Sequence, residues 1–271
     1  MTELNFETLR LHRRSPGVAQ ITMARADVFN AFDERMIAEL DCAFEALCAD
    51  PGVRVLVLAG EGKHFSAGAD LQWMQRAAGA SEDWNVQDAG RFAAMLQRIY
   101  ACPKPVVARI QGAALGGGVG LACACDIALA CRNASFAVSE AKFGILPAVI
   151  GPYLVNALGK RQAQRLALTT ERLDAAQALA LGLVHAVCDD EAALDAALDR
   201  TVQQLLLGGP EAQREIKALY AQLPVGDIPP EVRALTAQTI ARVRGTPEAR
   251  AGFSAFLEKR PAPWIPDGGT P

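Results

Sequence analysis

Three consecutive glycines, Gly116, Gly117 and Gly118, constrain the fold of this chain more than any other feature. They follow residues 106–110, which are typical of a buried strand, and they lead into small apolar residues that continue to Cys125. Glycine has no Cβ, so a ligand can approach the backbone closely, and the first turn of a helix presents free N–H groups. Such N–H groups can stabilise negative charge that develops on an oxygen. The pattern therefore predicts either a tightly packed turn or a site for an oxyanion.

The glycine run does not match the common nucleotide-binding motifs. No Gly-Lys-Ser/Thr follows it, as a P-loop requires, and no G-x-G-x-x-G spacing passes through it. The net charge of −3 over 271 residues gives no indication of nucleic acid or a membrane surface as the main partner. The three histidines are far apart in sequence, so we expect no metal site.

The cysteines and the amino-terminal segment indicate a cellular compartment. Most of the seven cysteines lie in apolar segments and none forms a C-x-x-C pair, which predicts buried thiols in a reducing environment. The first residues are polar and contain no apolar signal core, and no apolar run reaches the length of a membrane span. We therefore expect a cytoplasmic protein that does not bind a membrane.

Strand patterns alternate with helix patterns up to about residue 190, and only helix patterns follow. The strands are expected at 9–12, 18–23, 53–58, 106–110, 126–130 and 184–188. The helices are expected after Asp33, from about Asp70, and at 86–100, 151–158, 161–168, 174–181 and within 191–257. This order predicts an α/β core over residues 1–200 with a helical region over 201–271.

Four motifs occur in a fixed order along the chain: FSAGADLQWM, GAALGGGVGLACACDIALAC, FAVSEAKFGILP and GFSAFLEKRPAPW. Together they resemble the crotonase (enoyl-CoA hydratase/isomerase) family over about residues 8–264. The resemblance implies a spiral of repeated β-β-α units, C-terminal helices that make trimer contacts, and an acyl-CoA thioester as substrate, with no further cofactor. Trimers, often paired into hexamers, are common in this family, so we expect a homotrimer or a hexamer.

The resemblance also implies which residues carry the chemistry. Ala69 and Gly117 match the two residues whose N–H groups hold the thioester carbonyl oxygen as it becomes enolate-like. Glu140 matches a catalytic glutamate of the family, and the apolar residues around it would raise its pKa and make it a usable acid or base. Outside that context, Glu140 would be an ordinary solvated loop residue.

A second set of residues matches positions that contact coenzyme A. Ala67 matches a residue whose carbonyl meets the adenine, and Lys63 matches a lysine near the phosphates. Gly116 and Asp70 belong to the same two motifs, although Asp70 also fits a helix N-cap. Lys259, with the arginine that follows it, matches a basic pair that can reach the CoA of a neighbouring subunit.

One departure from the family pattern leaves the reaction open. Typical hydratases of the family carry a second glutamate four residues after the start of the glycine run, where this chain has Gly120. One carboxylate can activate water and return the proton to C2, or it can move a proton between C2 and C4 as a Δ3,Δ2-enoyl-CoA isomerase does. A non-catalytic acyl-CoA-binding homologue is a third alternative, which the retained Glu140 disfavours. The GGGVGL and SEAKFGILPAVIGPYLVNALG segments resemble bacterial 3-methylglutaconyl-CoA hydratases, which favours hydration.

Four further side chains near these motifs have two interpretations. His64 is expected to be a loop residue at the CoA entrance rather than a base. Trp73 and Met74 are expected to line the acyl pocket or to pack in the core. Tyr153 lies on a predicted helix that would face the acyl chain.

Overall fold

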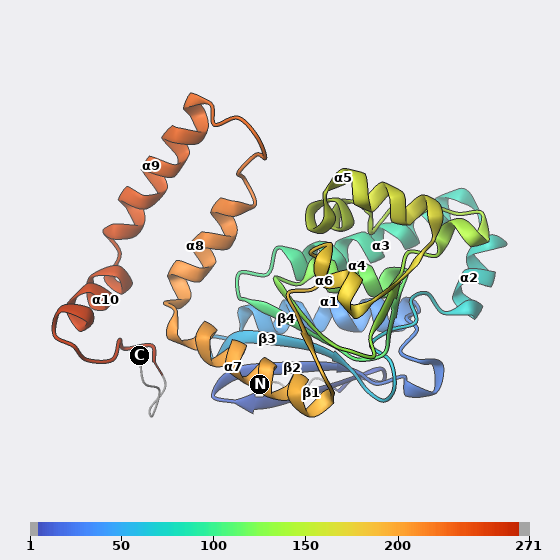
Figure 1. Ribbon diagram of the computed structural model, residues 1–271, viewed down its shortest axis with the longest axis horizontal. Coiled ribbons are helices and arrows are strands. Elements are labelled where there is room, and N and C mark those ends of the chain that lie inside the picture. Colours follow the sequence, from blue (N-terminus) through green and yellow to red (C-terminus); the bar gives the residue numbers. More distant parts are fainter. Residues whose placement is uncertain (1–4, 266–271) are drawn as a thin grey trace.

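The computed structural model describes residues 5–265, in which two β-sheets are covered by helices (Figure 1). The larger sheet has six strands, of which β1 and β2 are antiparallel and the remaining neighbours are parallel. In spatial order, these strands are β1 (Leu9–Ser15), β2 (Gly17–Met23), β3 (Val53–Gly60), β4 (Val106–Ile110), β6 (Ile127–Cys131) and β9 (Ala186–Cys188). The smaller sheet consists of β5 (Ala113–Leu115), β7 (Ser135–Ala137) and β8 (Arg172–Asp174).

The helices connect and cover these strands. The core contains α1 (Glu34–Ala49), α2 (Leu71–Ala78), α3 (Glu82–Tyr100), α4 (Gly117–Ala124), α5 (Gly151–Thr169), α6 (Ala175–Ala180) and α7 (Glu191–Leu207). Two short 3-10 helices, η1 (Ala26–Val28) and η2 (Glu140–Phe143), interrupt the loops. The C-terminal part contains α8 (Pro210–Tyr220), α9 (Pro230–Arg244) and α10 (Pro247–Leu257).

Successive turns of the chain repeat one arrangement and so form a spiral. Each turn places one strand in the large sheet and then one extended segment beside the small sheet, before a helix returns the chain. The large-sheet strands β3, β4 and β6 are neighbours, and so are the segments that follow them, since Ser66 pairs with Ala114 in β5 and β5 pairs with β7. The expected α/β spiral of β-β-α units is therefore confirmed.

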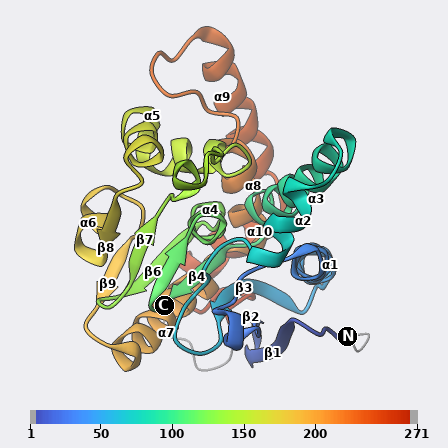
Figure 2. The same cartoon turned by 90° about the vertical axis from the view of Figure 1, so that its right-hand side faces the viewer.

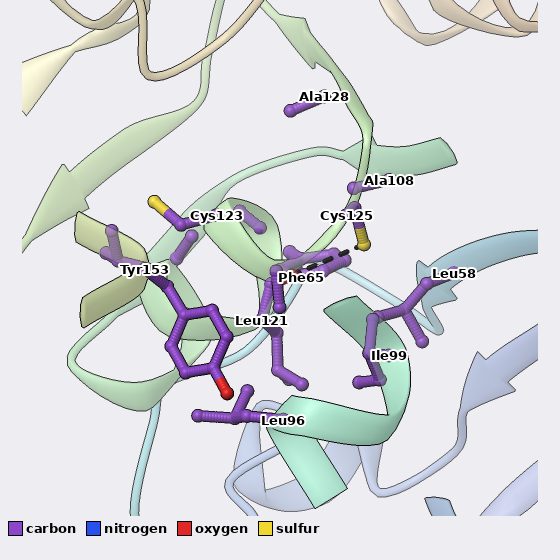
Figure 3. Packing of buried hydrophobic residues seen from close by; sticks show 14 of the residues in the cluster. Leu58, Phe65, Leu96, Ile99, Ala108, Leu121, Cys123, Cys125, Ala128 and Tyr153 are labelled. Carbon is purple, nitrogen blue, oxygen red and sulfur yellow. Dashed lines mark hydrogen bonds between the residues drawn. The ribbon is translucent and has the colours of Figure 1, made fainter. Parts of the chain in front are cut away.

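The central strands of the large sheet are buried on both faces, as the apolar run in β3 predicts. Along β3 the side chains alternate: Val55 and Val57 pack with α7, whereas Leu56 and Leu58 belong to the main core beneath α1, α3 and α4. Figure 2 shows α4 and α7 on opposite sides of the sheet. Figure 3 shows Leu58 within the main core, near Ile99 of α3. Helices on both faces therefore hold β4 in place, and the chain leads from the carboxyl end of β4 through β5 into the glycine run.

Several local predictions are confirmed by cap geometry. The side chains of Asp33, Asp70 and Asp174 each accept backbone N–H groups at the start of α1, α2 and α6. Gly159 has φ 71° and ψ 153° and interrupts α5, where the sequence predicts two helices. Helix α3 begins at Glu82, four residues before the predicted start, because Ser81 caps it by accepting the Trp84 N–H.

The C-terminal helices differ from the rest of the molecule. Helices α8 and α9 contain no buried residue, and α10 buries only Ala255. In Figure 1 these helices extend away from the sheets. The predicted boundary at residue 200 falls inside α7, which packs on the sheet through Leu198 and Val202. The projecting helical part therefore begins after α7.

Candidate active site

A cavity of about 300 Å³ opens where the two sheets meet the start of α4. Its lining comes from four segments: residues 67–69, helix α2, the glycine run and the region of η2. The lining residues are Ala67, Gly68, Ala69, Leu71, Trp73, Met74, Ala77, Leu115, Gly116, Gly117, Ser139, Glu140, Phe143 and Ile145. The cavity thus brings together five of the eight predicted site residues, from motifs more than 70 residues apart in sequence.

Backbone pairing places residues 66–69 directly beside the glycine run. The Ser66 N–H donates to Ala113 O at 3.1 Å, and the Leu115 N–H donates to Ser66 O at 3.0 Å. Gly68 has φ 88°, and a Cβ there would lie 2.6 Å from Leu115 O and 3.6 Å from Gly117 N. Only glycine permits this approach, because a side chain would collide with the neighbouring backbone. Gly68 therefore brings the Ala69 and Gly117 segments together.

The neighbouring peptide planes fix the direction of the two predicted N–H groups. In a trans peptide, the N–H points away from the preceding C=O. Gly68 O accepts the Phe32 N–H at 2.8 Å, so the Ala69 N–H points away from that partner. Gly116 O accepts the Val119 N–H at 2.9 Å inside the first turn of α4, so the Gly117 N–H points out of the helix. Within residues 5–265, neither of these N–H groups donates to a protein acceptor.

Glu140 places a buried carboxyl group against the glycine run. A Cβ on Gly116, which has φ 49°, would lie 3.1 Å from Glu140 Oε1. Burial raises the pKa of Glu140 above its ordinary value, and hydrogen bonds from the Glu140 and Ser139 backbone N–H groups offset part of this shift. Glu140 Oε2 is buried and has no hydrogen-bond partner among the described residues. The carboxyl group is therefore available to take up or release a proton in the cavity.

The position of the second family glutamate is closed by hydrocarbon. A Cβ on Gly120 would lie 2.3 Å from Ile150 Cγ2 and 3.8 Å from Leu96 Cδ1. Ile150 is only 2 % exposed, so it has little room to move aside. In the described part of the chain, Glu140 is the only carboxylate in the lining of the cavity.

The predicted CoA contacts are placed differently from one another. Ala67 and Gly116 line the cavity, whereas Lys63, Asp70 and Lys259 do not. Asp70 caps α2 and forms an ion pair with Arg25 at 3.0 Å, which confirms its capping role. The contact of these five residues with CoA stays a prediction.

His64 has a structural role in the loop before residues 66–69. Its Nδ1 accepts the Ala113 N–H at 2.9 Å. Burial lowers the pKa of His64, and the nearby positive charges of Lys63 and Arg172 lower it further. A neutral ring with an acceptor at Nδ1 matches the expected loop residue rather than a base.

Helix α2 contributes Trp73 and Met74 to the cavity lining. Trp73 also belongs to the main core, so both of its predicted roles apply, whereas Tyr153 packs against Tyr100 outside the lining. The Trp73 Nε1–H donates to Asp88 Oδ2 at 2.9 Å, and both side chains are buried. The sequence gives no signal for Asp88, because the partner lies 15 residues away on another helix.

The comparisons with known proteins agree with this geometry. The family model described as Enoyl-CoA hydratase/isomerase matches residues 13–266. The chain belongs to the enoyl-CoA hydratase/isomerase family. A putative enoyl-CoA hydratase of Thermus thermophilus is 37% identical over 232 residues, which cover 86% of this chain and 91% of that protein. A carnitinyl-CoA dehydratase of Citrobacter koseri is 33% identical over 95% of this chain and 98% of its own length.

Solved structures of the family share the fold over nearly the whole chain. An enoyl-CoA hydratase from Shewanella pealeana aligns with a TM-score of 0.92 and 40% identity, covering 96% of each chain. AtuE of Pseudomonas aeruginosa aligns with a TM-score of 0.91 and 39% identity, covering 96% of this chain and all of that one. These relatives identify the chain as an enzyme of the lyase class, with hydratase-type activity.

Among residues 5–265, no helix is both long enough and apolar enough to cross a membrane. The same residues contain no cluster of three or more side chains suited to a metal ion.

Proposed function

We propose that this protein adds water across the 2,3 double bond of an enoyl-CoA thioester, with Glu140 as its single acid–base carboxylate. The observation that carries the proposal is the Glu140 carboxyl group, which lies against the glycine run and whose buried Oε2 has no hydrogen-bond partner within residues 5–265. In this proposal, the Ala69 and Gly117 N–H groups bind the thioester carbonyl oxygen. Negative charge on that oxygen is then stabilised by two donors that need no reorganisation.

The chemistry balances with one carboxylate. Glu140 takes a proton from water while the water oxygen bonds to C3, and the electron pair of the double bond moves toward the thioester oxygen. Collapse of this enolate takes the proton from Glu140 onto C2. The product is a 3-hydroxyacyl thioester, and Glu140 returns to its ionised form.

The CoA part of the substrate is proposed to follow the family pattern. Ala67 would meet the adenine through its carbonyl, and Lys63 would lie near the phosphates. Gly116 and Asp70 would contact the cofactor-like portion of the substrate, and Lys259 would reach the CoA of a neighbouring subunit. The binding region would thus extend beyond the cavity that holds the acyl group.

The acyl group we propose to test first is 3-methylglutaconyl, which rests on the motif resemblance. The described cavity lining contains no arginine, lysine or histidine. Backbone N–H groups or water would therefore have to meet the distal carboxylate of that substrate. A crotonyl or 3-methylcrotonyl thioester, which lacks this carboxylate, is the matched comparison.

A second candidate reaction is Δ3,Δ2-enoyl-CoA isomerisation. It is favoured by the closed position at Gly120, because an isomerase needs only one carboxylate to remove a proton from C2 and deliver it to C4. A non-catalytic acyl-CoA-binding role is disfavoured by the buried Glu140 Oε2, which has no hydrogen-bond partner in the described part of the chain.

Product analysis separates these functions. The enzyme would be incubated with 3-methylglutaconyl-CoA, crotonyl-CoA and a 3-enoyl-CoA, and the products would be identified by mass spectrometry. A gain of one water on a 2-enoyl thioester supports the hydratase. Rapid migration of the double bond without hydration establishes the isomerase instead, and binding without conversion establishes the non-catalytic role.

We also propose that the protein assembles as a homotrimer or hexamer. In the single chain, the projecting helices leave large apolar side chains exposed to solvent. An exposed apolar surface of this kind is typical of a protein–protein interface. These side chains are Ile216, Tyr220, Ile240, Phe253, Phe256 and Leu257.

A further inference from the structure

Phe32 contacts both segments that carry the proposed oxyanion-binding N–H groups. Its N–H donates to Gly68 O at 2.8 Å, and its carbonyl accepts the Asp70 N–H at 3.0 Å. These two bonds hold the peptides on both sides of Ala69. They fix the rotation of the Gly68–Ala69 peptide plane and hence the direction of the Ala69 N–H.

The Phe32 ring supports the second N–H group. A Cβ on Gly117 would lie 2.1 Å from Phe32 Cζ, and 3.0 and 3.1 Å from the two Cε atoms of the same ring. All three distances are shorter than an ordinary van der Waals contact. The ring therefore packs directly on the Cα of Gly117. Phe32 is only 1 % exposed, so solvent does not separate the two groups.

Other aromatic side chains hold the Phe32 ring in place. The Phe92 ring lies with its centroid 5.1 Å away, and the Trp73 ring lies with its centroid 6.2 Å away. Trp73 is in turn held by its hydrogen bond to Asp88. Close packing of this kind transmits displacement, because side chains in a dense core have few alternative positions.

We infer that Phe32 is a positioning residue that sets the separation and direction of the Ala69 and Gly117 N–H groups. Its backbone orients one donor and its ring supports the other. This inference rests on the proposed oxyanion-binding role of those two groups. The contribution of the Phe32 ring can be tested by substitution, because its hydrogen bonds to Gly68 and Asp70 are made by the backbone.

The first test compares Phe32→Leu with Phe44→Leu. Both replace a buried phenylalanine of the same core by a smaller apolar residue. Phe44 lies on α1 and, unlike Phe32, is not among the side chains that a Cβ on Gly117 would meet. Loss of a whole oxyanion donor lowers kcat by about 10²–10³, so a displaced donor in Phe32→Leu is expected to lower kcat by roughly 10–100-fold. KM is expected to stay within about threefold in both variants, and Phe44→Leu is expected to retain kcat.

The second test uses the close approach of the ring to Gly117. In the native background, Gly117→Ala places a methyl group against Phe32 Cζ and is expected to lower kcat strongly. Leucine has no atom at the Cζ position, so the same Gly117→Ala change is expected to cost less in the Phe32→Leu background. Equal costs of Gly117→Ala in both backgrounds would overturn the inference, because the two residues would then act independently.

A spectroscopic readout separates this inference from the proposed reaction. Isotope-edited infrared spectroscopy would measure the thioester carbonyl stretch of bound butanoyl-CoA, which is saturated and cannot be hydrated. Two directed N–H donors lower that frequency, and Phe32→Leu is expected to reduce the shift while Phe44→Leu retains it. An unchanged shift in Phe32→Leu would contradict the positioning role. A native protein that shows the shift but converts no enoyl thioester would overturn the proposed reaction alone.

Discussion

The helix that begins with the glycine run and the C-terminal helices differ in how much of their surface is buried within one chain. Every residue of α4 is buried, and its glycines lie where a Cβ would collide with Phe32, Ser66 or Ile150. Helices α8 and α9 bury no residue in the same chain. The first region is packed within one chain, whereas the second exposes an apolar surface, which a further copy of the chain covers in the proposed oligomer. Chemistry and assembly should therefore respond to different substitutions.

The largest effect is expected from removing the proton acceptor in the first region. Glu140→Gln keeps the shape of the side chain but cannot accept a proton, so kcat is expected to fall by roughly 10²–10⁴ with CoA binding nearly unchanged. Steady-state kinetics and calorimetry with an acyl-CoA measure the two quantities. Glu82→Gln, on an exposed first turn of α3, is the matched control and should retain full activity. Unchanged kcat in Glu140→Gln would contradict the assigned role.

The pH dependence of activity provides a second test of the same carboxyl group. Burial raises the pKa of Glu140, which stabilises the protonated form, and hydration requires the ionised form as base. The value of kcat/KM is therefore expected to rise with pH through a pKa above that of an ordinary glutamate, and this limb should vanish in Glu140→Gln. The free energy of unfolding is expected to change in the opposite direction with pH. The folded state binds the proton more tightly, so this contribution to the free energy of unfolding is lost as pH rises through the raised pKa.

A charge on the projecting helices should disrupt assembly without altering the cavity. Phe253 and Phe256 are 61% and 81% exposed in the single chain, and each would contribute about 1.5–3 kcal/mol if buried in an oligomer. The Phe253→Asp/Phe256→Asp variant is expected to shift the sedimentation coefficient from an oligomer to a monomer. Leu168→Asp changes a similarly exposed apolar residue at the end of α5 and should leave the oligomer intact. A native protein that already sediments as a monomer would remove the basis for this prediction.

The closed position at Gly120 gives a smaller effect within the core. Gly120→Glu must displace Ile150 and is expected to lower the free energy of unfolding by about 1–3 kcal/mol or more, as overpacking does. In the Ile150→Ala background, the added side chain has space, so the same change should cost less. Chemical denaturation of the native protein, the two single variants and the double variant measures this coupling. Additive losses would show that Ile150 does not close the position.

The smallest expected effect concerns the wall of the cavity. Trp73→Phe removes the N–H that Asp88 Oδ2 accepts and is expected to lower the free energy of unfolding by about 1–3 kcal/mol, since this buried oxygen loses its partner while Oδ1 keeps its bond from Arg91. Trp84→Phe, also near α2, is the matched control and should cost less, because no hydrogen bond of its Nε1–H is present within residues 5–265. Similar losses in the two variants would indicate that the Asp88 bond contributes little.

Many local features of this protein could be predicted from its sequence, because they depend on interactions between residues that are close along the chain. Asp33, Asp70 and Asp174 cap helices because a short acceptor side chain satisfies free N–H groups wherever the backbone turns into a helix. The alternating valines and leucines of β3 predict a strand buried on both faces, and the glycine run predicts close backbone approach. The resemblance of the ordered motifs likewise predicts Ala69, Gly117 and Glu140 in one site, and all three line the same cavity.

The three-residue strands β5, β7 and β8 escaped sequence interpretation, because segments so short carry no periodicity and form only through pairing with one another. The contacts of Phe32 with Gly117, Asp88 with Trp73, and Ile150 with Gly120 join residues 15 to 85 positions apart in sequence. Such contacts depend on how the spiral stacks its turns, which no local pattern encodes. The sequence by itself thus predicted the longer elements and the candidate site residues, whereas only the tertiary structure decided how the short strands pair, that Ile150 closes the position of Gly120, and that Phe32 contacts the segments of Ala69 and Gly117, because packing between distant segments sets all three.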